Sequence, residues 1–341
     1  FPFSPPRVPN ISISSPDQMF LVQGVFSFDG TNDIGEANYI LNGTLLHGFT
    51  NRTSWVPLSQ ANSGGSNDAD RRSRKPSELE CFNFESPADD IAYYKNDQLH
   101  SGSFREILQH ISNSANWGGT YTLTPNNFGG AYAGRSFVIN SGNPPGSWVS
   151  TSDTNWFYCA YWENLRVPDE KTDVFISGAT ANADIKSNAA YAELYNKIAK
   201  ARNVFVSDNI LKVNGSVLNT LEVHGDININ TGGLIDMQSG GSQDGKIYLY
   251  GNWNNNDIIN GFNEGNGTVY LSGTQPQIIN SNDHNSPETF NNLEINNNFN
   301  TAVSNNLITN GYLKIGSGKS VTIAPNDYFR IGGDITSDGN L

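Results

Sequence analysis

The sequence predicts a mainly β protein, in which a mixed, β-rich N-terminal module with one short helix precedes a C-terminal β-solenoid. Three observations support this prediction. Apolar residues make up only 36% of the chain while Gly occurs 34 times, which is typical of many short strands joined by tight turns. Beyond residue 204, short segments of alternating polar and apolar residues are separated by Gly and Asn, with no helical pattern between them. Some of these segments resemble one another, as the coils of a solenoid do.

A chain of 341 residues is long enough for two or more hydrophobic cores. We place the N-terminal module at residues 1–150. Residues 151–203 are interpreted as a linker with the first solenoid strands, and residues 204–341 as the solenoid itself. Because the repeats run to the end of the sequence, we expect the solenoid to continue beyond residue 341 in a longer parent protein.

The N-terminal module contains signals for both strands and a helix. An apolar run at residues 19–22 predicts a strand that ends at Gly24, and the turn-forming residues 29–33 then favour a hairpin. A capping box at Ser103 and Glu106, followed by apolar residues at helical spacing, predicts a short helix over residues 103–113.

A second apolar stripe at helical spacing falls between the two modules. Tyr191, Leu194, Tyr195 and Ile198 recur among alanines, which predicts a helical insertion near residues 187–202.

The C-terminal region contains nine segments with the alternation of short strands. They are residues 211–213, 221–223, 227–229, 247–250, 269–271, 293–295, 312–315, 321–323 and 328–331. Residues 219–223 resemble 291–295, and residues 249–252 resemble 330–334. Such strands cannot bury a face alone and are expected to stack into a solenoid. An array of β-sandwiches is the alternative.

Charge and hydropathy exclude some classes of function. The formal net charge of −13 argues against nucleic acid as a partner, because such binding depends on Lys and Arg contacts with phosphates. Only 16% of the residues are charged, as in many extracellular bacterial proteins. No stretch reaches the roughly 18 uninterrupted apolar residues of a transmembrane segment.

No catalytic motif is present, and we expect no enzymatic activity. The sequence has no nucleophile elbow, zinc-protease helix, phosphate-binding loop or dinucleotide fingerprint. Its five histidines are scattered, at His47, His100, His110, His224 and His284. The adjacent acids 89–90 and 169–170 are interpreted as turn residues, since the paired carboxylates of glycosidases face each other across a cleft.

Metal binding is left open. Residues 29–36 place oxygen ligands at alternate positions but lack the closing Glu of a calcium loop. Structural calcium in the Asn- and Asp-rich turns of the solenoid is the one candidate cofactor. Asn in those turns is equally explained by left-handed backbone conformations or by ladders of stacked side chains.

The chain has two cysteines, Cys81 and Cys159, which are too few for a disulfide framework. In an exported protein they are candidates for one disulfide. Two free buried thiols are the alternative.

Aromatic residues gather near the predicted linker. Trp148, Trp156 and Trp162 are candidates for a platform on which glycan rings stack. The alternative is that these indoles fill the interface where the core of the solenoid begins.

Residues 156–176 have the pattern W-F-x-C-x-x-W, then V-P, then T-D-V-x-I. Later stretches include residues 251–256, 265–274, 277–279 and 290–295, and upstream stretches include residues 16–24 and 89–94. In these features the chain resembles extracellular proteins of the Bacteroidetes that are exported by type IX secretion. Within the 341 residues it departs from them by the helical insertion and by lacking their C-terminal sorting domain.

The resemblance implies a secreted protein on the outer face of a Gram-negative outer membrane, of the adhesin or gliding-motility type. It also implies that the outer-membrane machinery of type IX secretion is a partner, together with surface glycans or cell-surface proteins. A carbohydrate-binding or polysaccharide-degrading protein is the alternative, because the same modules accompany secreted enzymes.

Overall fold

The computed structural model of the chain divides into two units, residues Phe1–Gly142 and Asn143–Leu341. It describes the backbone alone for residues 18–31, 37–50, 83–85, 91–94, 117–120 and 301. Backbone and side chains are described for residues 81, 101–116, 138–140, 142–178, 181–186, 198–213, 220–238, 244–257, 261–281, 286–297 and 302–338. The boundary lies a few residues before the predicted one, because Ser147 and Trp148 already belong to the solenoid.

The first unit contains the predicted hairpin. Strands β1 (Gln18–Thr31) and β2 (Ala37–Thr50) pair in antiparallel register, and β3 (Asn83–Glu85) adds parallel to β2. The prediction that the first strand ends at Gly24 was wrong, because Gly24 pairs with Gly43 within the continuous ladder. A glycine in the middle of a strand therefore did not mark a turn.

The helix predicted at residues 103–113 is confirmed as α1 (Phe104–Ile111). Ser103 Oγ accepts from the Glu106 backbone N–H at 3.2 Å, and Glu106 Oε2 accepts from the Ser103 backbone N–H at 2.9 Å. These two bonds form the expected capping box. The backbone bond from Ser103 is the main reason why the pKa of Glu106 is lowered.

Four short strands and a turn of 3₁₀ helix complete the described part of this unit. Strands β4 and β6 are antiparallel, and β5 and β7 are parallel. The elements are β4 (Ile91–Tyr94), β5 (Ser101–Gly102), η3 (Ser114–Asn116), β6 (Trp117–Thr120) and β7 (Val138–Ile139).

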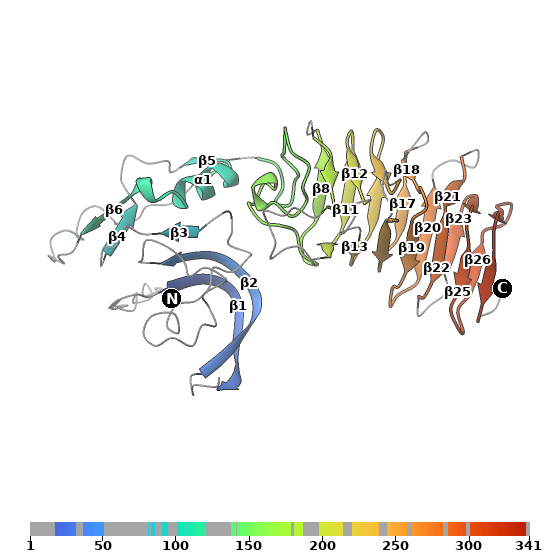
Figure 1. The fold of residues 1–341 in the computed structure, drawn as a ribbon, viewed down its shortest axis with the longest axis horizontal. Coiled ribbons are helices and arrows are strands. Elements are labelled where there is room, and N and C mark those ends of the chain that lie inside the picture. Colours follow the sequence, from blue (N-terminus) through green and yellow to red (C-terminus); the bar gives the residue numbers. More distant parts are fainter. Residues whose placement is uncertain are drawn as a thin grey trace, which may run out of the picture. The chain divides into compact units, whose positions relative to one another are not determined.

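The second unit is a parallel β-solenoid with three sides (Figure 1). One side is a seven-stranded sheet, called here the β10–β28 sheet. Its strands are β10 (Ala199–Ala201), β13 (Thr220–Val223), β16 (Lys246–Leu249), β19 (Thr268–Leu271), β22 (Asn292–Ile295), β25 (Leu313–Ile315) and β28 (Ile335–Ser337).

The second side is also a seven-stranded sheet, the β8–β26 sheet. Its strands are β8 (Val174–Ser177), β11 (Val204–Ser207), β14 (Ile227–Ile229), β17 (Trp253–Asn255), β20 (Gln277–Ser281), β23 (Thr301–Ser304) and β26 (Val321–Ile323).

The third side consists of two shorter parallel sheets. The first has β9 (Ala183–Asp184), β12 (Ile210–Lys212), β15 (Leu234–Asp236) and β18 (Phe262–Asn263). The second has β21 (Glu288–Phe290), β24 (Leu307–Thr309) and β27 (Phe329–Ile331).

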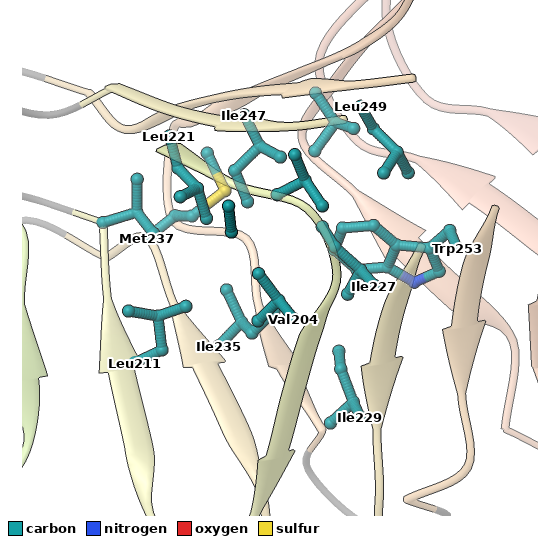
Figure 2. Packing of buried hydrophobic residues seen from close by; sticks show 14 of the residues in the cluster. Val204, Leu211, Leu221, Ile227, Ile229, Ile235, Met237, Ile247, Leu249 and Trp253 are labelled. Carbon is teal, nitrogen blue, oxygen red and sulfur yellow. The ribbon is translucent and has the colours of Figure 1, made fainter. Parts of the chain in front are cut away.

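Each strand pairs with the equivalent strand one coil away, so the inward side chains form continuous rows. Leu221, Ile247, Val269 and Leu293, for example, follow one another in register, and each is at most 1% exposed. Figure 2 shows side chains from the three sides meeting in one interior. A single core therefore runs through the stacked coils, as the alternation in the sequence requires.

Asparagine and aspartate side chains hold the corners between coils. Asn203 Oδ1 accepts from the Asp226 backbone N–H at 2.8 Å, Asp226 Oδ1 from Asn252 at 2.6 Å, and Asn252 Oδ1 from Ile278 at 2.9 Å. A Cβ at the neighbouring Gly251 would lie 2.3 Å from the Gly225 carbonyl oxygen, so this corner excludes a side chain there.

Both explanations for the abundance of Asn hold for particular residues. Asn254 Nδ2 donates to Asn228 Oδ1 at 3.1 Å, which makes a ladder between coils. Asn305 and Asn326 instead adopt left-handed conformations, with φ of 81° and 74°.

The N-terminal end of the solenoid is closed by a tryptophan cap, formed by residues 147–162. Trp148 N donates to Phe175 O at 2.9 Å, and Trp156 N donates to Asp184 O at 2.8 Å, so the cap satisfies the free edges of β8 and β9. The indoles of Trp148 and Trp156 pack edge-on against that of Trp162, with centroids 5.0 and 4.7 Å apart. The cap therefore covers both the apolar end of the core and its unpaired backbone.

The third side is interrupted between β18 and β21, which do not pair within the described residues. The rings of Trp253, Phe262 and Phe290 meet there, with centroids 4.8 to 5.5 Å apart. Beside them the fully buried Glu288 accepts a hydrogen bond from Asn255 Nδ2 through Oε2. Its other oxygen, Oε1, has no hydrogen-bond partner within the described residues.

The last described coil is open on one side. Strands β26, β27 and β28 each end their sheets, and the inward residues Ile323 and Ile335 are 38% and 47% exposed. The equivalent residues one coil earlier, Val303 and Leu313, are 2% and 1% exposed. Within the described residues, the inward side chains therefore change from buried to exposed from one coil to the next.

The predicted solenoid is confirmed, and the alternative of a β-sandwich array is wrong, because the strands pair in parallel between successive coils. Each of the nine segments predicted as strands overlaps a strand of the solenoid. The repeat of residues 219–223 in 291–295 is also confirmed, since β13 and β22 lie in one sheet. The match of 249–252 to 330–334 was wrong, because the first follows β16 and the second follows β27 on another side.

Two predictions about residues 151–203 need correction. The first solenoid strands predicted here are present as β8 to β10, but the part interpreted as a linker belongs to the tryptophan cap, which shares the solenoid core. The helical insertion was placed at residues 187–202, yet Ala199–Ala201 form β10 with both alanines facing inward. Residues 187–197 lie outside the described residues. No helix in the described part of the chain is long and apolar enough to span a membrane.

Candidate functional site: the tyrosine face

The outward side chains of the β10–β28 sheet form the most distinctive surface of the solenoid, called here the tyrosine face. Its central row has one residue from each of six successive coils. In order these are Lys200, Glu222, Tyr248, Tyr270, Glu294 and Lys314. Their inward neighbours are buried, so the backbone alternation fixes the direction in which each of these side chains points.

The two tyrosines at the centre of the row are stacked. The rings of Tyr248 and Tyr270 have centroids 4.4 Å apart and planes inclined by 7°. This stacking follows from the parallel register, which places identical positions of adjacent coils about 4.8 Å apart. Each ring therefore uses one of its faces to contact the other ring.

A carboxylate flanks the tyrosine pair on each side and is held by neighbours. Glu222 Oε2 lies 3.8 Å from both Lys200 Nζ and His224 Nε2. Glu294 Oε2 lies 3.4 Å from Lys314 Nζ, and Glu294 Oε1 accepts a 2.8 Å hydrogen bond from Tyr312. Side-chain exposures of 20% for Glu222 and 13% for Glu294 show that both carboxylates are packed against this surface.

A second, shorter row runs beside the first. His224 and Tyr250 stack with centroids 5.0 Å apart, two residues beyond Glu222 and Tyr248 in their coils. The tyrosine face therefore gathers four tyrosines and one histidine on adjacent coils.

The phenols of Tyr250, Tyr270 and Tyr312 remain protonated over the whole physiological range. Burial, with the charge of nearby Glu294, raises the pKa of Tyr270 to about 12. Burial also raises the pKa of Tyr250, where Glu222 contributes, and of Tyr312, whose phenol bonds to Glu294. The face thus offers O–H donors next to carboxyl groups.

This arrangement suits binding better than acid–base hydrolysis. Glu222 and Glu294 are three coils apart, which corresponds to about 14 Å at the spacing of parallel strands. Glycosidases hold their two carboxyl groups about 5 to 9.5 Å apart. The two carboxylates of this face do not meet that requirement.

The residues predicted as a glycan-stacking platform are not on a surface. Trp148, Trp156 and Trp162 are 2%, 0% and 0% exposed. The prediction of a stacking platform was therefore wrong, since a buried indole has no free face for a sugar ring. The alternative holds: these indoles fill the end of the core as the tryptophan cap.

Both predicted disulfide cysteines are disulfide-bonded in the structure, and neither is a free thiol. Cys159 begins the short 3₁₀ helix η5 (Cys159–Tyr161) of the tryptophan cap and is 2% exposed. The alternative of two buried free thiols does not apply.

The other candidate residues do not gather into a centre. Within the described residues, no group of three or more His, Cys, Asp or Glu side chains is placed to hold a metal ion. Of the calcium-spaced residues 29–36, the first three are in β1 and residues 32–36 lie outside the described part. Calcium binding therefore stays a prediction.

The acidic pair at residues 169–170 serves local structure. Asp169 Oδ1 accepts from the backbone of Lys171 at 3.0 Å and from the Thr172 hydroxyl at 2.7 Å, which closes a turn. Glu170 pairs with Lys200 at 3.6 Å. Residues 89–90 lie outside the described residues.

Sequence reasoning missed the tyrosine face, although a signal was present. The coils contain T-L-E-V, K-I-Y-L, T-V-Y-L, N-L-E-I and Y-L-K-I. When these segments are aligned by their inward residues, the third residue of each belongs to the central row of the tyrosine face. Together they supply all of that row except Lys200.

Comparison with known proteins gives no match: no family model, no curated protein and no solved structure is similar to this chain.

Proposed function

We propose that the chain is a secreted, cell-surface structural and adhesive protein without catalytic activity, exported by type IX secretion. In this proposal the solenoid serves as a stalk, and the tyrosine face is the surface that it presents. Partners would be the outer-membrane machinery of type IX secretion during export, and surface glycans or cell-surface proteins afterwards.

The observation that carries the proposal is the regular row of the tyrosine face. Six coils each contribute one side chain, and these side chains form three contacting pairs: Lys200–Glu222, Tyr248–Tyr270 and Glu294–Lys314. A flat, preorganised surface of this kind favours binding to an extended partner. The disulfide bonding of Cys81 and Cys159 fits an oxidising compartment, and the motif of residues 156–176 favours export by type IX secretion.

An experiment on intact cells tests the proposal. An antibody raised against the chain should label intact cells of the organism that makes it, and a deletion should reduce attachment to surfaces. Inactivation of the type IX translocon should abolish the labelling. Labelling that requires lysis of the cells would contradict the proposal.

A further inference from the structure

The tyrosines of the β10–β28 sheet differ chemically from the outward row of the neighbouring β8–β26 sheet. That row consists of the stacked pair Phe175–Phe205 followed by Asn228, Asn254 and Asn280 at successive coils. There an amide–amide hydrogen bond of 3.1 Å joins Asn254 to Asn228. Both sheets thus carry a stacked aromatic pair, but only the tyrosine pair has hydroxyl groups and carboxylates on either side.

Hydrogen-bonding groups of both kinds alternate on the tyrosine face. Tyr248 and Tyr270 bring hydroxyl groups, while Glu222 and Glu294 bring carboxylate acceptors on either side. Because Glu222 is held by Lys200 and His224, and Glu294 by Lys314 and Tyr312, little side-chain entropy is lost on binding. Sugar hydroxyls, which both donate and accept, complement such a row.

The charge on this face selects against ionic ligands. Each glutamate of the central row is paired with a lysine of the same row, so the row is neutral overall. The chain has a net charge of −13, which repels polyanions at longer range. An uncharged partner therefore fits this surface better than a uronic acid polymer or a phosphate-rich one.

The spacing favours a chain over a single small molecule. The central row extends over five coil steps, or about 24 Å at the spacing of parallel strands. A regular row of polar and aromatic groups gains affinity by repeating weak contacts along an extended ligand.

We propose that the tyrosine face binds an extended, uncharged glycan chain that lies along the solenoid axis. The stacked rings of Tyr248 and Tyr270 form the centre of the contact, and Glu222 and Glu294 accept hydrogen bonds from sugar hydroxyls on either side. This inference rests on the proposed adhesive function and names the chemical class of its partner.

The test is depletion of the full-length, disulfide-bonded chain from solution by insoluble neutral polysaccharides, with cellulose and chitin as probes. The wild type should bind at least one of them. Tyr248→Ala/Tyr270→Ala should weaken that binding by about tenfold or more, since tyrosines that become buried on binding contribute much of the energy of such contacts. The milder Tyr248→Phe/Tyr270→Phe variant keeps the rings and should lose less, and it tests the hydroxyl groups even if the alanine variant fails to fold.

Phe205→Ala is the matched control. It removes one ring of the stacked pair Phe175–Phe205, with centroids 5.0 Å apart, from the other seven-stranded sheet. It should leave the binding unchanged. Equal losses in the control and the tyrosine variants would overturn the proposal, as would binding to alginate in preference to both neutral polymers.

Failure of this inference is distinguishable from failure of the proposed function. If the chain binds none of the polysaccharides yet still mediates attachment of cells to protein-coated surfaces, the glycan proposal is overturned and the adhesive function stands. If cells attach equally well without the chain, the adhesive function itself fails.

Discussion

The side-chain amide of Asn255 donates a 2.8 Å hydrogen bond to Glu288 Oε2, joining two coils at the point where the third side of the solenoid is interrupted. A carboxyl group at this position is costly when ionised, because it is fully buried and only one of its oxygens has a partner within the described residues. The interruption of the third side therefore places a titratable group inside the core.

This relationship predicts a pH-dependent stability. Burial, with the carboxylate of Glu264 adding to it, raises the pKa of Glu288 from 4.5 to about 7, against the lowering effects of the Asn255 bond and of the nearby indole N–H of Trp253. Below the pKa of the unfolded state, 4.5, the carboxyl group is protonated in both the folded and the unfolded state, so Glu288 does not change the stability. As the pH rises from 4.5 to about 7, the unfolded state releases its proton first. The free energy of unfolding therefore falls, by up to about 3 kcal/mol by pH 8.

Glu288→Gln should remove this dependence and be more stable than the wild type at pH 8. Denaturant midpoints measured between pH 4 and pH 9 test this prediction. Glu222→Gln on the tyrosine face is the control, and it should keep the pH dependence of the wild type. A Glu288→Gln variant with the pH slope of the wild type would contradict the assignment.

The tryptophan cap is expected to contribute strongly to stability. Trp162 is fully buried, packs against Trp148 and Trp156, and donates from Nε1 to Trp156 O at 2.8 Å. Trp162→Ala should therefore cost about 3 to 5 kcal/mol. Chemical unfolding measures the loss, and Trp162→Phe should cost less because it keeps a ring. A loss below that of an exposed-site change such as Lys314→Ala would show that the cap is dispensable.

The corner ladder can be tested at Asp226, whose Oδ1 accepts from the backbone N–H of Asn252. Asp226→Ala leaves that donor without its acceptor and should cost about 1 to 3 kcal/mol of unfolding free energy. Asp226→Asn keeps an oxygen in place and should restore most of the stability. If the asparagine variant is as unstable as the alanine variant, the negative charge matters more than the hydrogen bond.

The disulfide is open to direct chemical test. Peptide mapping without reductant should recover Cys81 and Cys159 in one linked fragment, which separates on reduction. Removing the bond by Cys159→Ser should lower the free energy of unfolding by about 2 to 4 kcal/mol. Recovery of two alkylated thiols from the native protein would exclude the bond.

Much of the fold could be predicted from the sequence, because alternation at period two is a direct consequence of strand geometry. The segments around Leu221, Ile247 and Val269 show it clearly, and each is a strand of the solenoid. Strands β15 and β17 escaped prediction, because neither follows the polar–apolar alternation: the apolar Leu234 of β15 is at an outward position, and the polar Asn255 of β17 is buried.

The errors have physical reasons as well. Alanine suits a helix by propensity, yet Ala199 and Ala201 face inward from strand β10 and are buried in the solenoid core. The tryptophans looked like a surface platform because aromatic composition does not reveal burial. The tyrosine face emerged only from the register, which brings Tyr248 and Tyr270 into contact from coils that are far apart in the sequence.

The tryptophan cap gives the first coils of the solenoid a protection that amide hydrogen exchange can measure. Its backbone N–H groups at Trp148 and Trp156 donate to Phe175 and Asp184 on the edge strands β8 and β9. Since each coil is stabilised mainly by its neighbours, the amide protons of β8 and β11 should exchange slowly as long as the cap stays in place. Trp162→Ala should speed up the exchange in β8 most, and in each following coil by progressively less.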